Sequence, residues 1–186
     1  MPQEPSHEAH RREADKNTKD NPVCCAVLIV SDTRTLETDR GGALIVEHLT
    51  QAGHQIASLE IVKDEQGTIR ERLKTWCADP EIQVILTTGG TGVSRRDITT
   101  DVVRGLLSFE LQGFGELFRM LSYEQVKSAA MLSRAIAGLV IGSEESGGDT
   151  FIFALPGSTN AVETAMSNLV IPQLPHLVWE RMKEDS

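Results

Sequence analysis

Apolar, β-branched segments alternate with amphipathic segments along most of this chain, and the alternation limits the folds open to it. Strands are expected at Val23–Val30, Gln55–Ile61 and Ile82–Leu86, each separated from the next by a helical pattern. A helix between two such strands acts as a crossover, so that neighbouring strands run in the same direction. The sequence therefore predicts an α/β fold: a three-layer, doubly wound, mostly parallel sheet with helices on both faces.

The remaining elements continue the same pattern toward the C-terminus. A hairpin-like connection at Gly147-Gly148 is expected to join the last two strands, and Thr99 or Thr100 is expected to cap a helix. The further strands are Ala135–Gly142 and Thr150–Leu155, and the expected helices are Ala43–Gln51, Gln66–Ala78, Thr99–Leu107, the part of Gln112–Ala130 after Gly115, Pro156–Leu169 and Pro172–Lys183.

Composition narrows the class of protein. The chain has 186 residues, of which 40% are hydrophobic and 24% charged, as in an ordinary globular protein. Residues 1–21 are polar and are expected to form a disordered tail, followed by one domain at residues 22–186. A net charge of −9 and only 4% aromatic residues argue against nucleic-acid or anionic-membrane partners.

Two further patterns bear on where the protein acts. No apolar run reaches the roughly 18 residues of a membrane span, and the N-terminus has no apolar signal core, so a cytoplasmic protein is expected. Cys24, Cys25 and Cys77 make neither a disulfide framework nor a metal-ligand spacing. They are interpreted as small buried residues in a reducing compartment.

A glycine-rich run, Leu86–Gly92 (LTTGGTG), directly follows the third strand. Glycines at such a place let the chain turn sharply and bring its amides close to a ligand, while Thr91 adds a hydroxyl. The run matches neither the Rossmann pattern nor the P-loop pattern, which disfavours a dehydrogenase or a P-loop kinase. A phosphate-binding loop is therefore predicted here.

Two aspartates are candidates for a metal site beside this loop. Asp97 would repel a bound phosphate unless a cation lay between them, so its use there is to hold Mg²⁺. Asp39, ahead of a predicted helix, is interpreted either as a helix cap or as a second ligand carboxylate. Arg95 and Arg96 are candidates for offsetting phosphate charge.

Three polar loops are expected to meet at one edge of the sheet. The loops Ser31–Gly42, Thr87–Asp97 and Pro156–Asn160 each follow a predicted strand. In doubly wound sheets, ligands bind at the carboxyl ends of the strands. The convergence of these loops is a stronger indication of a binding site than any one motif.

These segments together resemble the MoaB/MogA family of molybdenum cofactor biosynthesis proteins, and the MoaB branch in particular. The resemblance covers about Val23 to Glu184. It rests on Ser31-Asp32-Thr33 with Asp39 and Gly42, Asp64, Thr87–Gly92 with Asp97, Gly113–Arg119 with Phe118–Ser122, Ser133-Arg134-Ala135 with Gly138, and Pro156-Gly157-Ser158.

The resemblance implies a molybdopterin-binding α/β fold in a homotrimer or homohexamer, working with other proteins of the cofactor pathway. Active members of the family adenylylate molybdopterin with Mg-ATP and release pyrophosphate. Asp39 and Asp97 would then be the catalytic, Mg²⁺-linked acids. The phosphate- and molybdopterin-binding residues would be Ser31, Thr88, Gly89, Gly90, Thr91, Gly92, Ser133, Arg134, Pro156, Gly157 and Ser158.

Two other functions stay open beside the adenylyltransferase. The chain could bind molybdopterin without turnover, as an inactive paralogue would, or serve as a scaffold. Two acids facing a phosphate favour the enzyme, since a pure binder gains nothing from them. Phe114, which lies between two glycines, is expected to form a lid or a subunit contact, and the acidic connection Ser143–Thr150 could disfavour ATP if it lay near the pocket.

Overall fold

The computed structural model describes residues 22–94, 97–142 and 148–184. The expectations for residues 1–21, for Arg95 and Arg96, and for most of the acidic connection lie outside these residues. The described chain forms one six-stranded sheet in the order β2-β1-β3-β6-β5-β4. Its strands are β1 Cys24–Val30, β2 Gln55–Val62, β3 Val84–Thr88, β4 Phe109–Glu110, β5 Ile136–Val140 and β6 Thr150–Leu155.

The sheet is mostly parallel, as predicted. Strands β2, β1, β3 and β6 pair in parallel, whereas β5 runs antiparallel to both of its neighbours, β6 and β4. Strand β5 is therefore the one strand of the described sheet that runs opposite to the others, and its antiparallel pairing with β6 agrees with the reversal expected between the last two long strands. As a result, β1, β3 and β6 are adjacent and end at the same edge.

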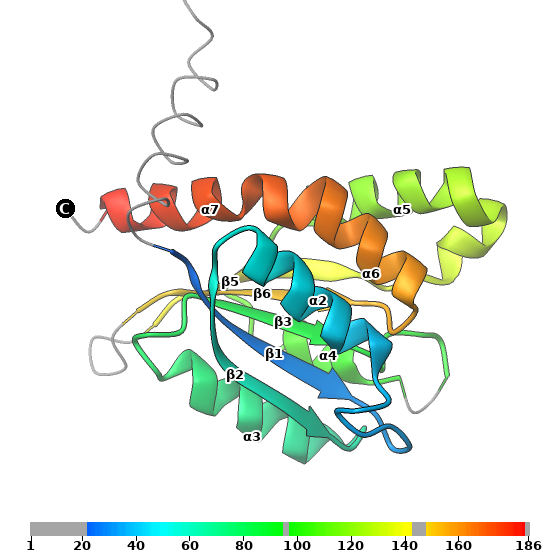
Figure 1. Cartoon of the computed structure of the whole chain (residues 1–186), viewed down its shortest axis with the longest axis horizontal. Helices are drawn as coiled ribbons and strands as arrows, with labels where there is room; N and C mark the ends of the chain where they lie inside the picture. The colour runs from blue at the N-terminus through cyan, green and yellow to red at the C-terminus, as the bar shows by residue number, and fades with distance from the viewer. Residues whose placement is uncertain (1–21, 95–96, 143–147, 185–186) are drawn as a thin grey trace, which may run out of the picture.

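Helices cover both faces of the sheet (Figure 1). Helices α2, α5, α6 and α7 pack on one face, and α3 and α4 pack on the other. The bounds are α2 Arg40–Gln51, α3 Gln66–Cys77, α4 Thr99–Arg104, α5 Gln112–Val126, the 3₁₀ segment η1 Lys127–Leu132, α6 Thr159–Ala165, the π-helical segment η2 Met166–Val170 and α7 Ile171–Glu184.

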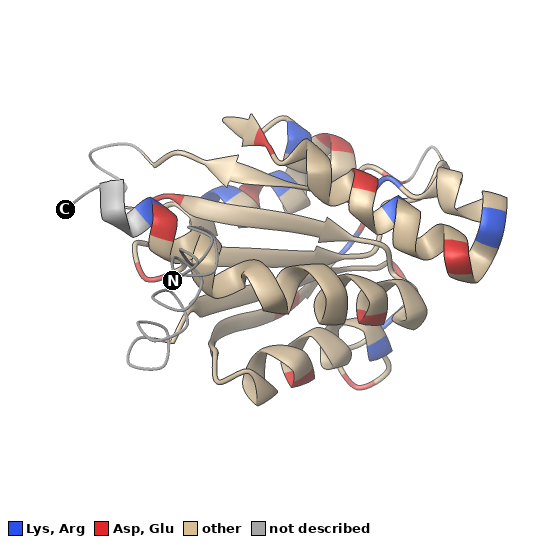
Figure 2. Ribbon diagram, turned by 90° about the horizontal axis from the view of Figure 1, so that it is seen from above, with Lys and Arg blue, Asp and Glu red and all other residues tan. Residues whose placement is uncertain are grey.

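Burial on both faces explains why the central strands are apolar without interruption. Cys25 and Val27 of β1 face the core under α2, while Ala26 and Leu28 face the core under α3. Strands buried on both sides need no polar positions. Figure 2 accordingly shows the charged residues on the outer helices and loops, with β1, β3 and β6 free of them.

Several predicted boundaries are wrong by a few residues. The third strand was expected at Ile82–Leu86, but β3 begins at Val84, because Ile82 still closes a turn on Asp79. It continues through Thr87 and Thr88, which pair with β6. The last two predicted helices are continuous through η2, and Pro172 is the second residue of α7.

Other corrections concern the second half of the chain. Neither Thr99 nor Thr100 caps α4: Ile98 is the N-cap residue, and both threonines are buried inside the helix. The two-residue strand β4 was missed, and α5 begins at Gln112 rather than after Gly115. Phe114 is neither a lid nor a subunit contact, because its ring is buried against Phe153 with the two centroids 5.4 Å apart.

Helix α5 is anchored by its buried phenylalanines, which gives a stability test. Phe118 is 1% exposed, and replacing it with alanine leaves a cavity that should lower the free energy of unfolding by about 3–5 kcal/mol. Tyr123 lies on the same helix but is 57% exposed, so Tyr123→Ala should change it by about 0.5 kcal/mol or less. Urea denaturation of both variants measures this difference, and equal losses would contradict the assigned face of α5.

Candidate functional site

A pocket of about 530 Å³ opens where the three adjacent strands β1, β3 and β6 end. Its walls are the β1–α2, β3–α4 and β6–α6 loops, together with Leu132 and Ser133 from the end of η1. The predicted convergence of three polar loops at this edge is confirmed. The predicted site residues that line the pocket are Ser31, Asp39, Thr88, Gly89, Gly90, Thr91, Gly92, Asp97, Ser133, Pro156, Gly157 and Ser158.

The glycine loop has a backbone that only glycine adopts easily. Gly89 has φ +98°, and a Cβ there would lie 2.2 Å from the carbonyl oxygen of Val30. Gly90 has φ +61°, and a Cβ there would lie 2.3 Å from Oγ1 of Thr99. These glycines therefore bring the loop against the end of β1 and the start of α4.

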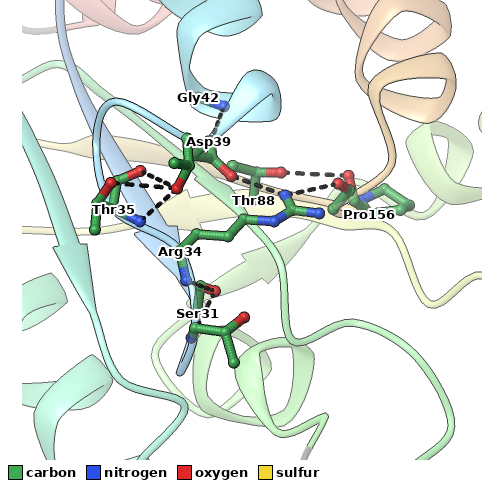
Figure 3. Close-up of polar contacts among 10 residues, drawn as sticks. Ser31, Arg34, Thr35, Asp39, Gly42, Thr88 and Pro156 are labelled. Atoms are coloured by element: carbon green, nitrogen blue, oxygen red, sulfur yellow. Dashed lines mark hydrogen bonds and ion pairs between the residues drawn. The ribbon is translucent and has the colours of Figure 1, made fainter.

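Asp39 caps helix α2 at the pocket wall. Its Oδ2 accepts a hydrogen bond from the backbone N–H of Gly42, and its Oδ1 accepts one from Nη1 of Arg34 at 2.8 Å (Figure 3). Helix α2 therefore begins at Arg40, not at Ala43 as predicted. The two glycines in its first turn allow close packing, because a Cβ on Gly42 would lie 2.4 Å from Cδ1 of Ile29.

The β6–α6 loop is tied to the glycine loop. Oγ1 of Thr88 donates to the carbonyl oxygen of Pro156 at 3.3 Å, as Figure 3 shows. A Cβ on Gly157 would lie 3.2 Å from the Cα of Gly89. The hydroxyl of Ser158 accepts from the backbone N–H of Ala161 and caps α6, which leaves its own O–H free to donate.

Arg134 does not line the pocket, unlike the other predicted binding residues. Its Nε donates to the carbonyl oxygen of Gly92 at 2.8 Å, its Nη2 donates to that of Asp97, and its Nη1 pairs with Asp101 at 2.9 Å. Arg134 thus contacts the backbone at the end of the glycine loop, Gly92, and at Asp97. The neighbouring Ser133 does line the pocket, and its buried Oγ has no hydrogen-bond partner among the described residues.

The fit of the pocket to Mg²⁺ differs between the two predicted ligands. Mg²⁺ keeps several waters and takes one or two carboxylates plus phosphate oxygens. Oδ2 of Asp97 accepts a hydrogen bond from the backbone N–H of Ser94 at 2.7 Å, its one hydrogen bond to a side-chain oxygen within the described residues. The described residues therefore leave most acceptor positions of this half-buried carboxylate open to a cation. Both oxygens of Asp39 are already bonded, one of them to a guanidinium. Asp97 therefore fits a Mg²⁺ ion, and Asp39 fits it less well.

Two charged residues at this edge, Asp64 and Arg34, are not among the predicted site residues, although Asp64 is one of the residues on which the family resemblance rests. A Cβ on Gly90 would lie 3.0 Å from Oδ2 of Asp64 and 3.1 Å from its Oδ1, so this carboxylate lies directly behind the glycine loop. Arg34 is the only Lys or Arg on the pocket wall in the described part of the chain. Asp64 was detectable in principle, because it follows β2, the neighbour of β1. The position of Arg34 could not be predicted, because it lies in the β1–α2 loop, whose turns the sequence does not specify.

Two other expectations concern metals and membranes. Within the described ranges, no group of three or more His, Cys, Asp or Glu side chains is arranged to hold a metal ion by itself. No described helix combines the length and the apolar character that crossing a bilayer requires.

Comparison with known proteins agrees with this fold and site. The sequence model for the family described as "Probable molybdopterin binding domain" matches residues 26–176. The molybdenum cofactor biosynthesis protein B of Bacillus subtilis is 44% identical over 180 residues, which is 96% of this chain and 99% of that protein. The corresponding protein of Staphylococcus carnosus is 50% identical over 167 residues, 88% of this chain and 94% of that one.

Solved structures give the same result. A molybdenum cofactor biosynthesis protein B superposes with a TM-score of 0.81 at 43% identity, covering 88% of this chain and 98% of that one. The tungsten cofactor synthesizing protein MoaB of Pyrococcus furiosus superposes with a TM-score of 0.74 at 34% identity, covering 87% and 98%. The fold is that of the molybdopterin-binding domains of this class. The chain belongs to the MoaB/MogA family of molybdenum cofactor biosynthesis proteins.

The glycine loop gives a direct test of the site's architecture. Gly89→Ala forces a side chain into the Val30 carbonyl at positive φ, and should lower the free energy of unfolding by at least about 2 kcal/mol. Gly67, inside α3, has no atom within 4 Å of an added Cβ. Gly67→Ala should therefore raise the free energy of unfolding by about 0.5–1 kcal/mol. Thermal and urea unfolding measure both changes, and a neutral Gly89→Ala would contradict the close approach of the loop to β1.

The cysteines should be poor nucleophiles, because Cys25 is buried and Cys24 and Cys77 are half-buried, all away from the pocket wall. Burial raises the pKa of Cys77 to about 11, and burial also raises the pKa of Cys25 and Cys24. Only the thiolate reacts, so at pH 8 about one Cys77 in a thousand is reactive. Iodoacetamide should label Cys77 of the native protein at least about 100-fold more slowly than Cys77 of the urea-unfolded protein. Equal rates measured by mass spectrometry would contradict the assigned burial.

Proposed function

We propose that the pocket binds molybdopterin and ATP and transfers the adenylyl group of ATP to molybdopterin, releasing pyrophosphate. Family membership supports the pathway, and the names of relatives such as the tungsten cofactor synthesizing protein support a pterin cofactor. The observation that carries the proposal is the position of a carboxylate, Asp97, on the same pocket wall as the glycine loop. A site built only to bind phosphate would not place an acid there.

The reaction needs positioning more than covalent chemistry. The terminal phosphate oxygen of molybdopterin attacks the α-phosphorus of ATP, and the bond from that phosphorus to the pyrophosphate oxygen breaks. Backbone amides of Gly90–Gly92 and the hydroxyls of Thr91 and Ser158 are suited to bind the phosphate oxygens. Holding two anions in line in this way replaces a bimolecular encounter by a preorganised one.

Mg²⁺ bound together with ATP supplies neutralisation of the phosphate charge when it is present. Asp97 is the best-fitting carboxylate for Mg²⁺, because the described residues leave most of its acceptor positions open. Asp39 is the less suitable ligand, and Asp64 is a further carboxylate at the same edge. The chain's own role is to hold Asp97 in place, which it does through Ser94 and Arg134.

A second candidate function is molybdopterin binding without turnover. The observation that favours it is that Asp39 is already engaged by Gly42 and Arg34, which leaves one of the two expected acids for the metal. Assembly into a homotrimer or homohexamer, cytoplasmic location and contact with other pathway proteins stay predictions. Exposed apolar side chains on α5 and η1, such as Leu117, Met120 and Met131, support self-association.

Direct turnover tests the proposed reaction. Purified protein, molybdopterin, ATP and Mg²⁺ should yield pyrophosphate and adenylylated pterin. Asp97→Asn should lower kcat by about 100-fold or more, because the amide no longer neutralises a cation. Asp79→Asn is the matched control, since Asp79 lies in the α3–β3 turn at the opposite edge of the sheet, and it should retain wild-type turnover.

The outcomes separate the two candidate functions. Pyrophosphate release that is lost in Asp97→Asn and kept in Asp79→Asn supports the adenylyltransferase. Tight pterin binding by a wild-type protein that releases no pyrophosphate would contradict the adenylyltransferase. It would support molybdopterin binding without turnover. Equal turnover by Asp97→Asn and the wild type would contradict the role assigned to Asp97, although the protein would still be an adenylyltransferase.

A further inference from the structure

Arg34 lies across the mouth of the pocket from the β1–α2 loop. Its Nη1 donates to Oδ1 of Asp39 at 2.8 Å and, more weakly, to the carbonyl oxygen of Gly157 at 3.4 Å. Figure 3 shows the side chain extending from the β1–α2 loop toward Pro156, with the guanidinium between the two loops. Arg34 therefore bridges two walls of the pocket.

The root of this side chain is fixed, while its end is open to solvent. Oγ of Ser31 accepts hydrogen bonds from the backbone N–H groups of Thr33 and Arg34, at 3.3 and 3.1 Å, and so closes the turn after β1. The side chain of Arg34 is 46% exposed, whereas that of Asp39 is 1% exposed. The buried carboxylate thus orients a guanidinium whose outer side faces the pocket and the solvent.

The guanidinium has donors to spare. Its hydrogen bonds to described residues all come from Nη1, although a guanidinium carries five N–H groups on three nitrogens. The planar arrangement of these groups matches two oxygens of one phosphate. Within the described ranges, every other charged side chain on the pocket wall is an aspartate.

Charge makes such a residue necessary. A phosphorylated ligand entering this pocket meets Asp39 and Asp97 in a protein of net charge −9. Backbone amides provide partial positive charge only. A full positive charge on the wall offsets the repulsion that the carboxylates would otherwise exert on the ligand.

We propose that Arg34 is the side chain that binds a phosphate group of the substrate, and that Asp39 is a positioning residue that holds the guanidinium toward the pocket. The inference rests on the proposed function in one respect, namely that the ligand of this pocket carries phosphate. It assigns to Asp39 a role in orienting Arg34 rather than in holding Mg²⁺. It also makes Arg34 the determinant that favours polyphosphates over uncharged ligands.

The test uses inorganic pyrophosphate as the probe, titrated into the full chain by calorimetry without pterin or nucleotide. Arg34→Gln should raise the Kd for pyrophosphate by about tenfold or more, and Arg34→Lys should fall between the two, because a single ammonium keeps the charge but loses the bidentate geometry. The Kd of the wild type should also rise more steeply with salt than that of Arg34→Gln. A purely structural tie between two loops would not produce this difference in salt dependence.

A matched control exists in the same fold. Arg72 of α3 pairs with Glu60 of β2 at 2.9 Å, and its side chain is 38% exposed, away from the pocket wall. Arg72→Gln should bind pyrophosphate within twofold of the wild type. Asp39→Asn keeps an acceptor for the cap but weakens the hold on Arg34, and should raise the Kd by a smaller factor than Arg34→Gln. Thermal unfolding confirms that each variant is folded.

Each outcome bears on one claim. Wild-type affinity and salt dependence in Arg34→Gln would overturn the role of Arg34 and leave the adenylyltransferase proposal standing. Pyrophosphate binding that depends on Arg34, in a protein with no adenylylation, would support Arg34 and overturn the adenylyltransferase. A wild-type protein that does not bind pyrophosphate would overturn the role of Arg34, while the turnover assay still decides on the adenylyltransferase.

Discussion

The contact between the glycine turn after β3 and the end of β1 is the constraint on which the pocket depends. Only a residue without a side chain can lie this close to the Val30 carbonyl, and the positive φ of Gly89 turns the chain at that point. The turn brings the loop beside the start of α2 on one side and beside Gly157 on the other. Without it, three strand ends would be adjacent in the sheet while their loops formed no common wall.

Charge is the second organising feature of this edge. Asp39, Asp64 and Asp97 all lie at or behind the same loops, which is unusual for a site suited to anions. Two of them are held by backbone or guanidinium contacts rather than left to solvent alone: Asp39 by Gly42 and Arg34, and Asp97 by Ser94. The arrangement suits a ligand that brings both phosphate and a divalent cation, because the acids then meet positive charge instead of bare phosphate.

Much of this was predictable from the sequence. Uninterrupted apolar strands alternating with helices specify a parallel sheet, and glycines after a buried strand specify a close-approach loop, so the fold and the convergence of three polar loops follow from local patterns. Ser133 was assigned to the site only through the family resemblance. Arg134 does not line the pocket, and its contacts with Gly92 and Asp97 are made across 37 residues or more of chain. No role at the site could be predicted for Arg34 or Asp64 from local patterns, since which loop charges face a shared pocket depends on tertiary packing. The early start of α2 depends on one side-chain cap by Asp39.

Whether the three loops form one phosphate-binding pocket is tested most directly by amide chemical-shift mapping of the ¹⁵N-labelled protein during titration with pyrophosphate. The amides of Gly90–Gly92, Arg34 and Ser158 should shift together along one binding curve, while amides at the opposite ends of the strands, such as that of Glu81, stay in place. Shifts confined to one loop, or centred on a surface away from the ends of β1, β3 and β6, would contradict a single pocket.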